Sequence, residues 1–439
     1  MKELKNKILW LKRHWFIRNV AALQAGSFSG TIIQSVIGIF IARLLQPELF
    51  GIYSLAIGMA GMTSLILGMG IQEAVSSLLG RAYVRRDRIE VEKILGFMLK
   101  ITFLAALAVI LVSAFLPGIA DRLYGNSLIG VYAAVVVVAS IFSSFLFVLV
   151  YSSFQVTGRV KLLGLLILSD QSLRYVLSLI FILVGFGVPG AVSGQLAGAI
   201  IIFIVSAFLF NNLIKKELIF PGLFRLIAVA REINLKNYFG FTFWVALDRN
   251  MGNVFMALPV ILTGIYVSAS DVSFFKLAFG YMNIILSLLG PISVLLNVEF
   301  PKMQIENKGY LYKSFKRISL YSLALSTMLS IGAVIVSSLV FKILYGESYL
   351  PSIKYVFGLI LYGSLFGIGV GLGPMWRSID KVKVSIIINS LILAGGIPLG
   401  LWLIKNYGLW GSVITVTIWF SASHLVSFVY LVRNLKTKI

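Results

Sequence analysis

The chain alternates between long apolar runs and short polar connections over its whole length. Each run holds about 20 residues, the length that an α-helix needs to cross a ~30 Å hydrocarbon core. Runs such as ITFLAALAVILVSAFLPGIA show no alternation of polar and apolar positions, which excludes transmembrane strands. We therefore predict an all-α polytopic membrane protein with about twelve transmembrane helices, at residues 19–42, 50–72, 95–117, 129–153, 162–184, 188–211, 238–265, 272–298, 318–341, 353–376, 384–404 and 408–431.

The composition supports this fold class and excludes several kinds of site. Of the 439 residues, 59% are hydrophobic and 12% are charged, and the mean hydropathy is +0.97. The absence of cysteine excludes disulfides, thiolate metal sites and cysteine nucleophiles. The two histidines, His14 and His424, lie near opposite ends of the chain, which argues against a histidine metal site. We expect a protein that is not an enzyme and has no resident cofactor or metal, and we leave open a coupling ion, H⁺ or Na⁺.

Basic residues decide the expected orientation in the membrane. The formal net charge is +22, and most of the 38 Lys and Arg residues fall in every second connection. Loops that stay in the cytoplasm retain Lys and Arg during insertion, so we predict that these connections and both termini are cytoplasmic. The first apolar run, about Asn19 to Leu45, is too long for a signal-peptide core and predicts a retained helix in the cell membrane. Orientation and contact with anionic lipid headgroups explain the basic excess, so no nucleic-acid partner is needed.

The two halves of the chain show an internal repeat at an offset of 221 to 222 residues. Because each repeat contains an even number of spans, both halves enter the membrane in the same sense. We predict an N-terminal six-helix lobe at 1–211, a cytoplasmic linker at 212–237 and a C-terminal six-helix lobe at 238–439. The linker is amphipathic enough to lie on the inner membrane surface, although a solvated connector is the alternative. The matched segments are FGIYSLA (50–56) with VSFFKLA (272–278), RLYGNSLIG (122–130) with ILYGESYLP (343–351), GRVK (158–161) with DKVK (380–383), and GVPGAV (187–192) with GLWGSV (408–413).

Four charged residues lie inside predicted spans. Counting 1.5 Å per residue, Asp248 lies roughly 15 Å into the seventh span, with Arg249 beside it. Asp170 and Arg174 lie roughly 13 to 20 Å from the cytoplasmic end of the fifth span. Such charges face protein or a water-filled cavity. The spacing of four predicts an intrahelical ion pair between Asp170 and Arg174 that braces the structure.

Asp248 and Arg249 cannot easily pair with each other, because adjacent helical residues point about 100° apart. At least one of them needs another partner. The aligned positions of the first half, within 24–27, carry no charge. Span seven therefore has a role that span one lacks, and for Arg249 a substrate or gating role and a structural role both stay open.

Charged residues near the ends of spans have simpler explanations. Lys276 lies one turn inside the outer end of span eight and Lys100 near the inner end of span three, where either side chain could extend to the interface. Two acidic residues lie at the inner ends of spans two and eight beside basic loops, where pairing is expected: Glu73 with Arg81, and Glu299 with Lys302.

Several segments resemble the polysaccharide exporter, or O-antigen flippase, family of the multidrug/oligosaccharidyl-lipid/polysaccharide superfamily. The resemblance covers nearly the whole chain through motifs that are individually loose but appear in a specific order. They are IARLLQPELFGIYSLA (41–56), the DRN of span seven, GIYVSASDVSFFKLA (264–278), PISVLLNVEFPKM (291–303) and FKILYGESYLPS (341–352).

The resemblance implies two lobes that alternate between inward-open and outward-open states around a central cationic cavity. The implied substrate is an oligosaccharide linked by diphosphate to a polyprenyl lipid, flipped from the inner to the outer leaflet for surface polysaccharide assembly. Arg249 matches the Asp-Arg position of the family and is the first candidate for the diphosphate. Further candidates for substrate contact are Lys276, Arg18 and Arg43, with Gln24 and Asn253 as polar groups for sugars, whereas Asp248, Asp170, Arg174, Glu73 and Glu299 are expected to be structural or gating charges.

Other functions remain open at this point. A cation-coupled multidrug antiporter of the same superfamily would concentrate acidic residues in one lobe, whereas here an arginine accompanies each midplane acid. A membrane glycan polymerase or ligase would carry a large outer loop with reactive residues, and the outer connections are short. A non-transporting scaffold is a further alternative. Besides the lipid-linked oligosaccharide and membrane lipids, the expected partners are a glycan polymerase or glycosyltransferases, and the expected state is a monomer.

Overall fold

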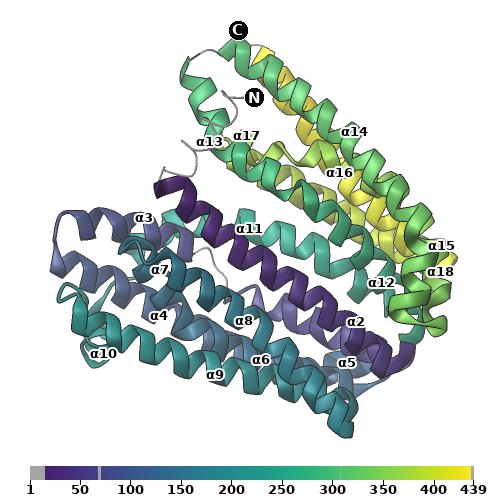
Figure 1. Ribbon diagram of the computed structural model, residues 1–439, viewed down its shortest axis with the longest axis horizontal. Coiled ribbons are helices and arrows are strands. Elements are labelled where there is room, and N and C mark those ends of the chain that lie inside the picture. The colour runs from purple at the N-terminus through teal and green to yellow at the C-terminus, as the bar shows by residue number, and fades with distance from the viewer. Residues whose placement is uncertain (1–14, 68–70, 307, 437–439) are drawn as a thin grey trace, which may run out of the picture. The chain divides into compact units, whose positions relative to one another are not determined.

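A computed structural model describes residues 15–67, 71–306 and 308–436, without the side chains of residues 15–28, 71–77, 236–246, 248, 249, 298, 306 and 308. The described residues form helices and connections with no strand, which confirms the all-α prediction (Figure 1). The α-helices are α2 (Trp15–Ser64), α3 (Ile71–Val84), α4 (Arg88–Ser113), α5 (Leu116–Tyr124), α6 (Ser127–Phe145), α7 (Phe147–Val156), α8 (Val160–Phe181), α9 (Gly187–Lys216), α10 (Leu223–Glu232), α11 (Lys236–Thr263), α12 (Ala269–Leu286), α13 (Gly290–Glu306), α14 (Lys308–Val340), α15 (Ile353–Gly358), α16 (Ile360–Gly369), α17 (Leu372–Ser378) and α18 (Val382–Lys436).

Seven helical stretches of the described chain are long and apolar enough to cross a membrane, or eight if the bent stretch from Glu347 to Ser378 counts as one span. Three of these stretches contain a break. Gln46 interrupts α2 with φ 60° and ψ 168°, Gly185 and Gly187 separate α8 from α9, and Gly408 interrupts α18. Each of the three stretches therefore consists of two helical segments. A total of twelve spans stays a prediction.

The breaks recur at matched positions of the proposed repeat. Gly187 has φ 53° and ψ −135°, and Gly408 has φ 56° and ψ −131°. Gly125 and Gly346 both have positive φ, at 64° and 91°. A side chain at such a position meets steric strain, so glycine is favoured there. The repeat itself stays a prediction, but its aligned glycines share an unusual backbone conformation.

The described helices separate into two compact units. Unit 1 comprises the described residues of Met1–Leu44, Thr63–Ile119 and Gly130–Ala246, and unit 2 those of Leu45–Met62, Ala120–Ile129 and Leu247–Ile439. Two short segments of the predicted N-terminal lobe, 45–62 and 120–129, therefore pack within unit 2. The predicted lobes stay a prediction.

The core of unit 1 joins helices that are far apart in the sequence. Buried side chains of α4, α7, α8, α9 and α10 form one apolar cluster that includes Phe97, Leu149, Leu163, Phe210 and Leu226. Helices α8 and α9 run side by side in Figure 1. They approach closely because Gly194 and Gly198 of α9 leave no room for a Cβ against the backbone of α8.

The predicted linker packs against protein. Its helix α10 lies on α4 and buries Leu226 completely. Arg225 forms a 2.9 Å ion pair with the buried carboxylate of Glu92 on α4. The Lys100 ammonium donates to the backbone oxygens of Arg231 and Ile233 at 3.1 and 2.7 Å. The Lys100 ammonium thus satisfies carbonyl groups at the end of α10, and its position at the membrane interface stays a prediction.

Unit 2 is held by an apolar cluster and by close helix contacts. Phe300, Phe315, Met375 and Leu431 are fully buried in the cluster shared by α13, α14, α17 and α18. Helices α14 and α16 pack closely, and the Ser326 hydroxyl donates to the backbone oxygen of Ser364 at 2.6 Å. Segments 45–62 and 120–129 pack near the turn between α11 and α12. Gly51 lies directly against the Ala269 carbonyl, and the Tyr124 hydroxyl donates to the Ile261 oxygen at 3.3 Å.

Candidate functional site

The candidate site of unit 2 is built on the hairpin of α11 and α12. Helix α11 ends at Thr263 and α12 begins at Ala269, where the Ser268 hydroxyl accepts a hydrogen bond from the Asp271 amide at 3.1 Å. This cap supplies a partner for an amide of the first turn, so it fixes the start of α12. Both helices pack on α18, because Phe255 of α11 and Phe279 of α12 each contact the ring of Phe420.

Polar residues recur along both helices of this hairpin. On α12, Lys276 and Asn283 are seven residues apart, which is two helical turns, and both are half-buried. On α11, Asn253 is exposed and lies half a turn from the buried Phe255. Measured from the turn at 1.5 Å per residue, Lys276 lies ~10 Å, Asn253 ~15 Å and Asn283 ~21 Å along its helix. The hairpin therefore carries polar groups over a length of ~21 Å from its turn.

Lys276 is the candidate cation whose side chain the structure describes. It lies between the buried residues Phe275 and Leu277 in the sequence of α12. Within the described part of the chain, no carboxylate lies within ion-pair distance of its ammonium and no hydrogen bond to it is formed. A half-buried ammonium that has no partner among the described residues suits an anion, because Lys supplies a compact charge with three donors.

Asn283 is held in place by a residue that the sequence pattern did not single out. The buried Tyr362 of α16 donates its hydroxyl to Asn283 Oδ1 at 2.6 Å. The Asn283 amide in turn donates to the Phe279 backbone oxygen at 2.8 Å. The Tyr362 ring packs edge-on against Phe420 at 5.0 Å. A tyrosine within an apolar run signals a buried hydroxyl that needs a partner, but the sequence does not say which partner it has.

The first candidate, Arg249, occupies position 14 of α11, one turn before Asn253. Its side chain and that of the adjacent Asp248 lie outside the described residues. The same holds for the side chains of Arg18 and Gln24 in α2 and of Glu73 in α3. For these five residues, the predicted roles stay predictions.

The charges of span five are placed clearly in unit 1. Arg174 Nη2 lies 3.0 Å from Asp170 Oδ2, and the side chains are 22% and 16% exposed. Arg174 Nε also donates to the Asp170 backbone oxygen at 3.2 Å. The predicted intrahelical ion pair is thus formed. Gly198 of α9 lies against the backbone of Arg174, so the pair is situated at a close contact between α8 and α9.

The remaining predicted residues belong to other helices. Arg43 belongs to unit 1, is exposed, and precedes the break of α2 at Gln46 by three residues. Glu299 of α13 accepts from Lys302 at 3.0 Å, so the expected pairing is present. No group of three or more His, Asp or Glu residues that could hold a metal ion occurs in the described chain.

His424 is the second residue that the pattern did not connect with a site. It lies on α18, its Nδ1 is 3.3 Å from the Leu365 backbone oxygen, and its ring packs against Phe366 and Phe420. Gly369 leaves the space that the ring fills. His424 therefore belongs to the packing between α16 and α18, next to the aromatic residues that support the hairpin.

The sequence from residue 16 to 303 matches the family model described as polysaccharide biosynthesis protein. This region covers more than half of the chain, and the match confirms the resemblance drawn from the motifs. A comparison with curated proteins gives no match.

Solved transporters share the fold. An inward-facing multidrug resistance MATE family transporter of the MOP superfamily superposes with a TM-score of 0.73 at 16% identity, covering 92% of this chain and 95% of its own. The lipid II flippase MurJ in an inward closed conformation gives 0.67 at 18% identity, covering 93% and 86%. The eukaryotic MATE transporter AtDTX14 gives 0.66 at 14% identity, covering 97% and 100%. At these identities the likeness concerns the fold.

Proposed function

We propose that this chain flips a lipid-linked oligosaccharide. The premise is that the chain belongs to the polysaccharide biosynthesis protein family and is a membrane transporter of the MOP superfamily. The substrate would consist of sugars joined by a diphosphate to a polyprenyl lipid. It would move from the inner to the outer leaflet by alternating access. The family match is the observation that carries the proposal, and the polar α11–α12 hairpin supports it.

The chemistry of such a substrate explains why a polar path is required. A diphosphate and sugars cannot enter hydrocarbon without partners, whereas the lipid tail can remain in the bilayer. The ammonium of Lys276 has no partner among the described residues and would neutralise part of the diphosphate charge. Asn253, which is exposed one turn after position 249, would hydrogen-bond sugar hydroxyls. Arg249 is proposed as the second cation.

The fold of MurJ, described as a lipid II flippase, shows that this architecture occurs in a protein that handles a lipid-linked substrate. The MATE transporters of the same fold favour a second candidate, namely a cation-coupled multidrug antiporter. A cation substrate would need an accessible carboxylate. Asp170, the midplane acid whose side chain the structure describes, is paired with Arg174, which makes this candidate the weaker one.

The experiment compares lipid-linked glycan on the outer leaflet of cells that lack their own exporter. Lys276→Ala and Arg249→Ala should each stop translocation at normal protein abundance, whereas Lys276→Arg and Arg249→Lys should restore part of it. Lys354→Ala is the control, since Lys354 is an exposed lysine whose ammonium lies 5.0 Å from the Tyr355 ring centroid. Full transport by both alanine variants would refute the roles of these cations. Efflux of drugs without glycan transport would favour the antiporter.

A further inference from the structure

One line of residues along α12 is left open by the packing of the helix. Within residues 275–283, the residues that are not buried are Lys276, Gly280 and Asn283. Their spacings of four and three residues place them on one helical face. A Cβ at Gly280 would meet no atom of the surrounding protein within 4 Å, so there is open space between the two polar side chains. Polar residues at membrane depth face protein or a water-filled cavity, so this line is suited to a polar ligand.

The amide of Asn283 is only partly satisfied by protein. Its nitrogen donates to the Phe279 backbone oxygen at 2.8 Å, and its Oδ1 accepts from the Tyr362 hydroxyl at 2.6 Å. A backbone carbonyl can only accept, so this contact fixes which end of the amide is the nitrogen. A side-chain amide offers two N–H donors and two lone pairs. One N–H and one lone pair therefore have no partner among the described residues.

Tyr362 holds this amide from the protein side. Its side chain is fully buried, and its ring centroid lies 5.0 Å from that of Phe420 and 5.4 Å from that of Phe279. The packed ring keeps the hydroxyl directed at Asn283. Because the other end of the amide bonds to its own helix, the side chain is held at both ends. Its free N–H and lone pair are thus preorganised for a ligand.

The two polar residues of this line suit different chemical groups. The Lys276 ammonium supplies donors and a positive charge, which match phosphate oxygens because these only accept. Asn283 supplies one donor and one acceptor, which match sugar hydroxyls because a hydroxyl can donate as well as accept. Seven residues separate the two side chains, about 10 Å along the helix. A ligand that contacts both therefore needs a phosphate at one end and sugar at the other.

We propose that Asn283 binds hydroxyl groups of the sugar attached to the diphosphate, and that Tyr362 is its positioning residue. This assignment rests on the proposed function, in which Lys276 contacts the diphosphate. A phosphate group at Asn283 would leave the free lone pair facing an anion, whereas sugar hydroxyls use both free positions of the amide. The space at Gly280 leaves room for the connection between sugar and phosphate.

The test measures binding of two probes to the detergent-purified full chain by microscale thermophoresis. Farnesyl diphosphate reports on the phosphate contact, and farnesyl diphosphate N-acetylglucosamine, the same lipid with one sugar attached, reports on both contacts. The wild type should bind the sugar-bearing probe more tightly. Asn283→Leu should weaken that probe about fivefold, the effect of one net hydrogen bond, and leave farnesyl diphosphate unchanged. Lys276→Met should weaken both probes.

Tyr362→Phe tests the positioning role, because it keeps the buried ring and removes only the hydroxyl. It should weaken the sugar-bearing probe about threefold, since the contact of Asn283 with Phe279 remains. The double variant Asn283→Leu with Tyr362→Phe should bind no more weakly than Asn283→Leu alone, because Tyr362 acts through Asn283. Thermal melting checks that each variant is folded. If Asn283→Leu alone unfolds, the double variant carries the test, since replacing both partners by apolar groups is nearly neutral.

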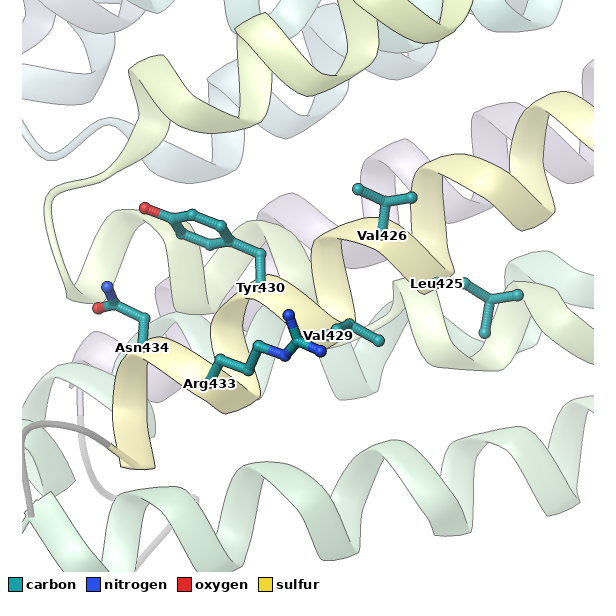
Figure 2. A pocket seen from close by; sticks show the side chains of 6 residues that line it. All are labelled: Leu425, Val426, Val429, Tyr430, Arg433 and Asn434. Atoms are coloured by element: carbon teal, nitrogen blue, oxygen red, sulfur yellow. The ribbon is translucent and has the colours of Figure 1, made fainter.

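Tyr430→Phe is the matched control. Tyr430 lies on the last turns of α18, where it lines a groove, ten residues after Phe420 (Figure 2). Its hydroxyl accepts from Lys381 Nζ at 3.3 Å, so this variant also removes a hydrogen bond between side chains of unit 2. It should leave the binding of both probes unchanged.

Two results would overturn the positioning role: additive losses in the double variant, or equal weakening of both probes by Tyr362→Phe. Equal binding of the two probes by the wild type, or an unchanged preference in Asn283→Leu, would overturn the sugar contact. Binding of farnesyl diphosphate that depends on Lys276 would leave the proposed function standing in that case. Binding of neither probe would count against the proposed function and the sugar contact together.

Discussion

The ion pair of span five gives a prediction whose size follows from the structure. Asp170→Ala removes the carboxylate that lies 3.0 Å from Arg174, whose side chain is 22% exposed. The guanidinium would keep a single described acceptor, the backbone oxygen of residue 170 at 3.2 Å. Stranding a cation in this way costs about 3 kcal/mol, the lower end of the range for a broken buried pair, because both side chains retain some exposure.

The double variant Asp170→Ala with Arg174→Ala should lose much less. Removing both partners leaves no buried charge, and replacing a buried ion pair by apolar groups is often neutral, within about 1 kcal/mol. Asp170→Asn should fall between the two, since an amide still accepts a hydrogen bond but gives no charge. The single variant must therefore be the least stable of the three.

Unfolding of the purified proteins in one detergent, followed by helical circular dichroism against denaturant, measures the order. Arg317→Ala, a change at an exposed arginine of α14, controls for loss of positive charge in general and should be near wild type. Equal losses in Asp170→Ala and in the double variant would refute the reasoning, because the aspartate would then act independently of Arg174.

Three shorter predictions follow from other contacts. Gly51→Ala should unfold or strongly destabilise the protein, because a Cβ would overlap the Ala269 carbonyl, whereas Gly61→Ala, with nothing within 4 Å, should be neutral or stabilising in the same melting assay. Lys100→Met should leave two carbonyl oxygens at the end of α10 without their lysine donor and so raise amide hydrogen exchange in residues 223–232. The control is Lys161→Met, a change at an exposed lysine of α8, which should raise this exchange less. A cysteine at Lys316 should react with a membrane-impermeant maleimide only after the cells are opened, and labelling of intact cells would reverse the predicted topology.

Much of the helical architecture could be predicted from interactions between residues that are close together in the sequence. Apolar runs without alternation predict helices because a bilayer leaves no water for unpaired backbone groups. The pair of Asp170 and Arg174 was also predictable from one helix, because a spacing of four residues brings two opposite charges together on the same face. The pairing of Glu299 with Lys302 needs a spacing of only three.

The contacts that the sequence did not reveal join residues far apart in the chain. The Lys100 ammonium donates to carbonyl groups 131 and 133 residues away, partners that the sequence did not indicate. Tyr362 donates to Asn283 across 79 residues. Hydropathy indicates that a buried hydroxyl or ammonium needs a partner, but the choice among partners depends on how helices pack, and side-chain spacing along one helix carries no information about that.

The candidate site rests on charged residues that the second half of the chain carries and the first half lacks, although both halves have a glycine with the same backbone conformation. Gly187 and Gly408 occupy equivalent positions of the predicted repeat and break their helices with nearly the same φ and ψ, so the local geometry does not distinguish the halves there. The charges predicted near the middle of the spans do distinguish the two halves, because Asp248 and Arg249 align with uncharged residues between 24 and 27. Lys276 adds a cation on the adjoining helix, and its repeat counterpart is Ser54. Arg249 and Lys276 are thus cations on one hairpin that their aligned positions in the first half lack, which supports placing the proposed diphosphate contact on α11 and α12.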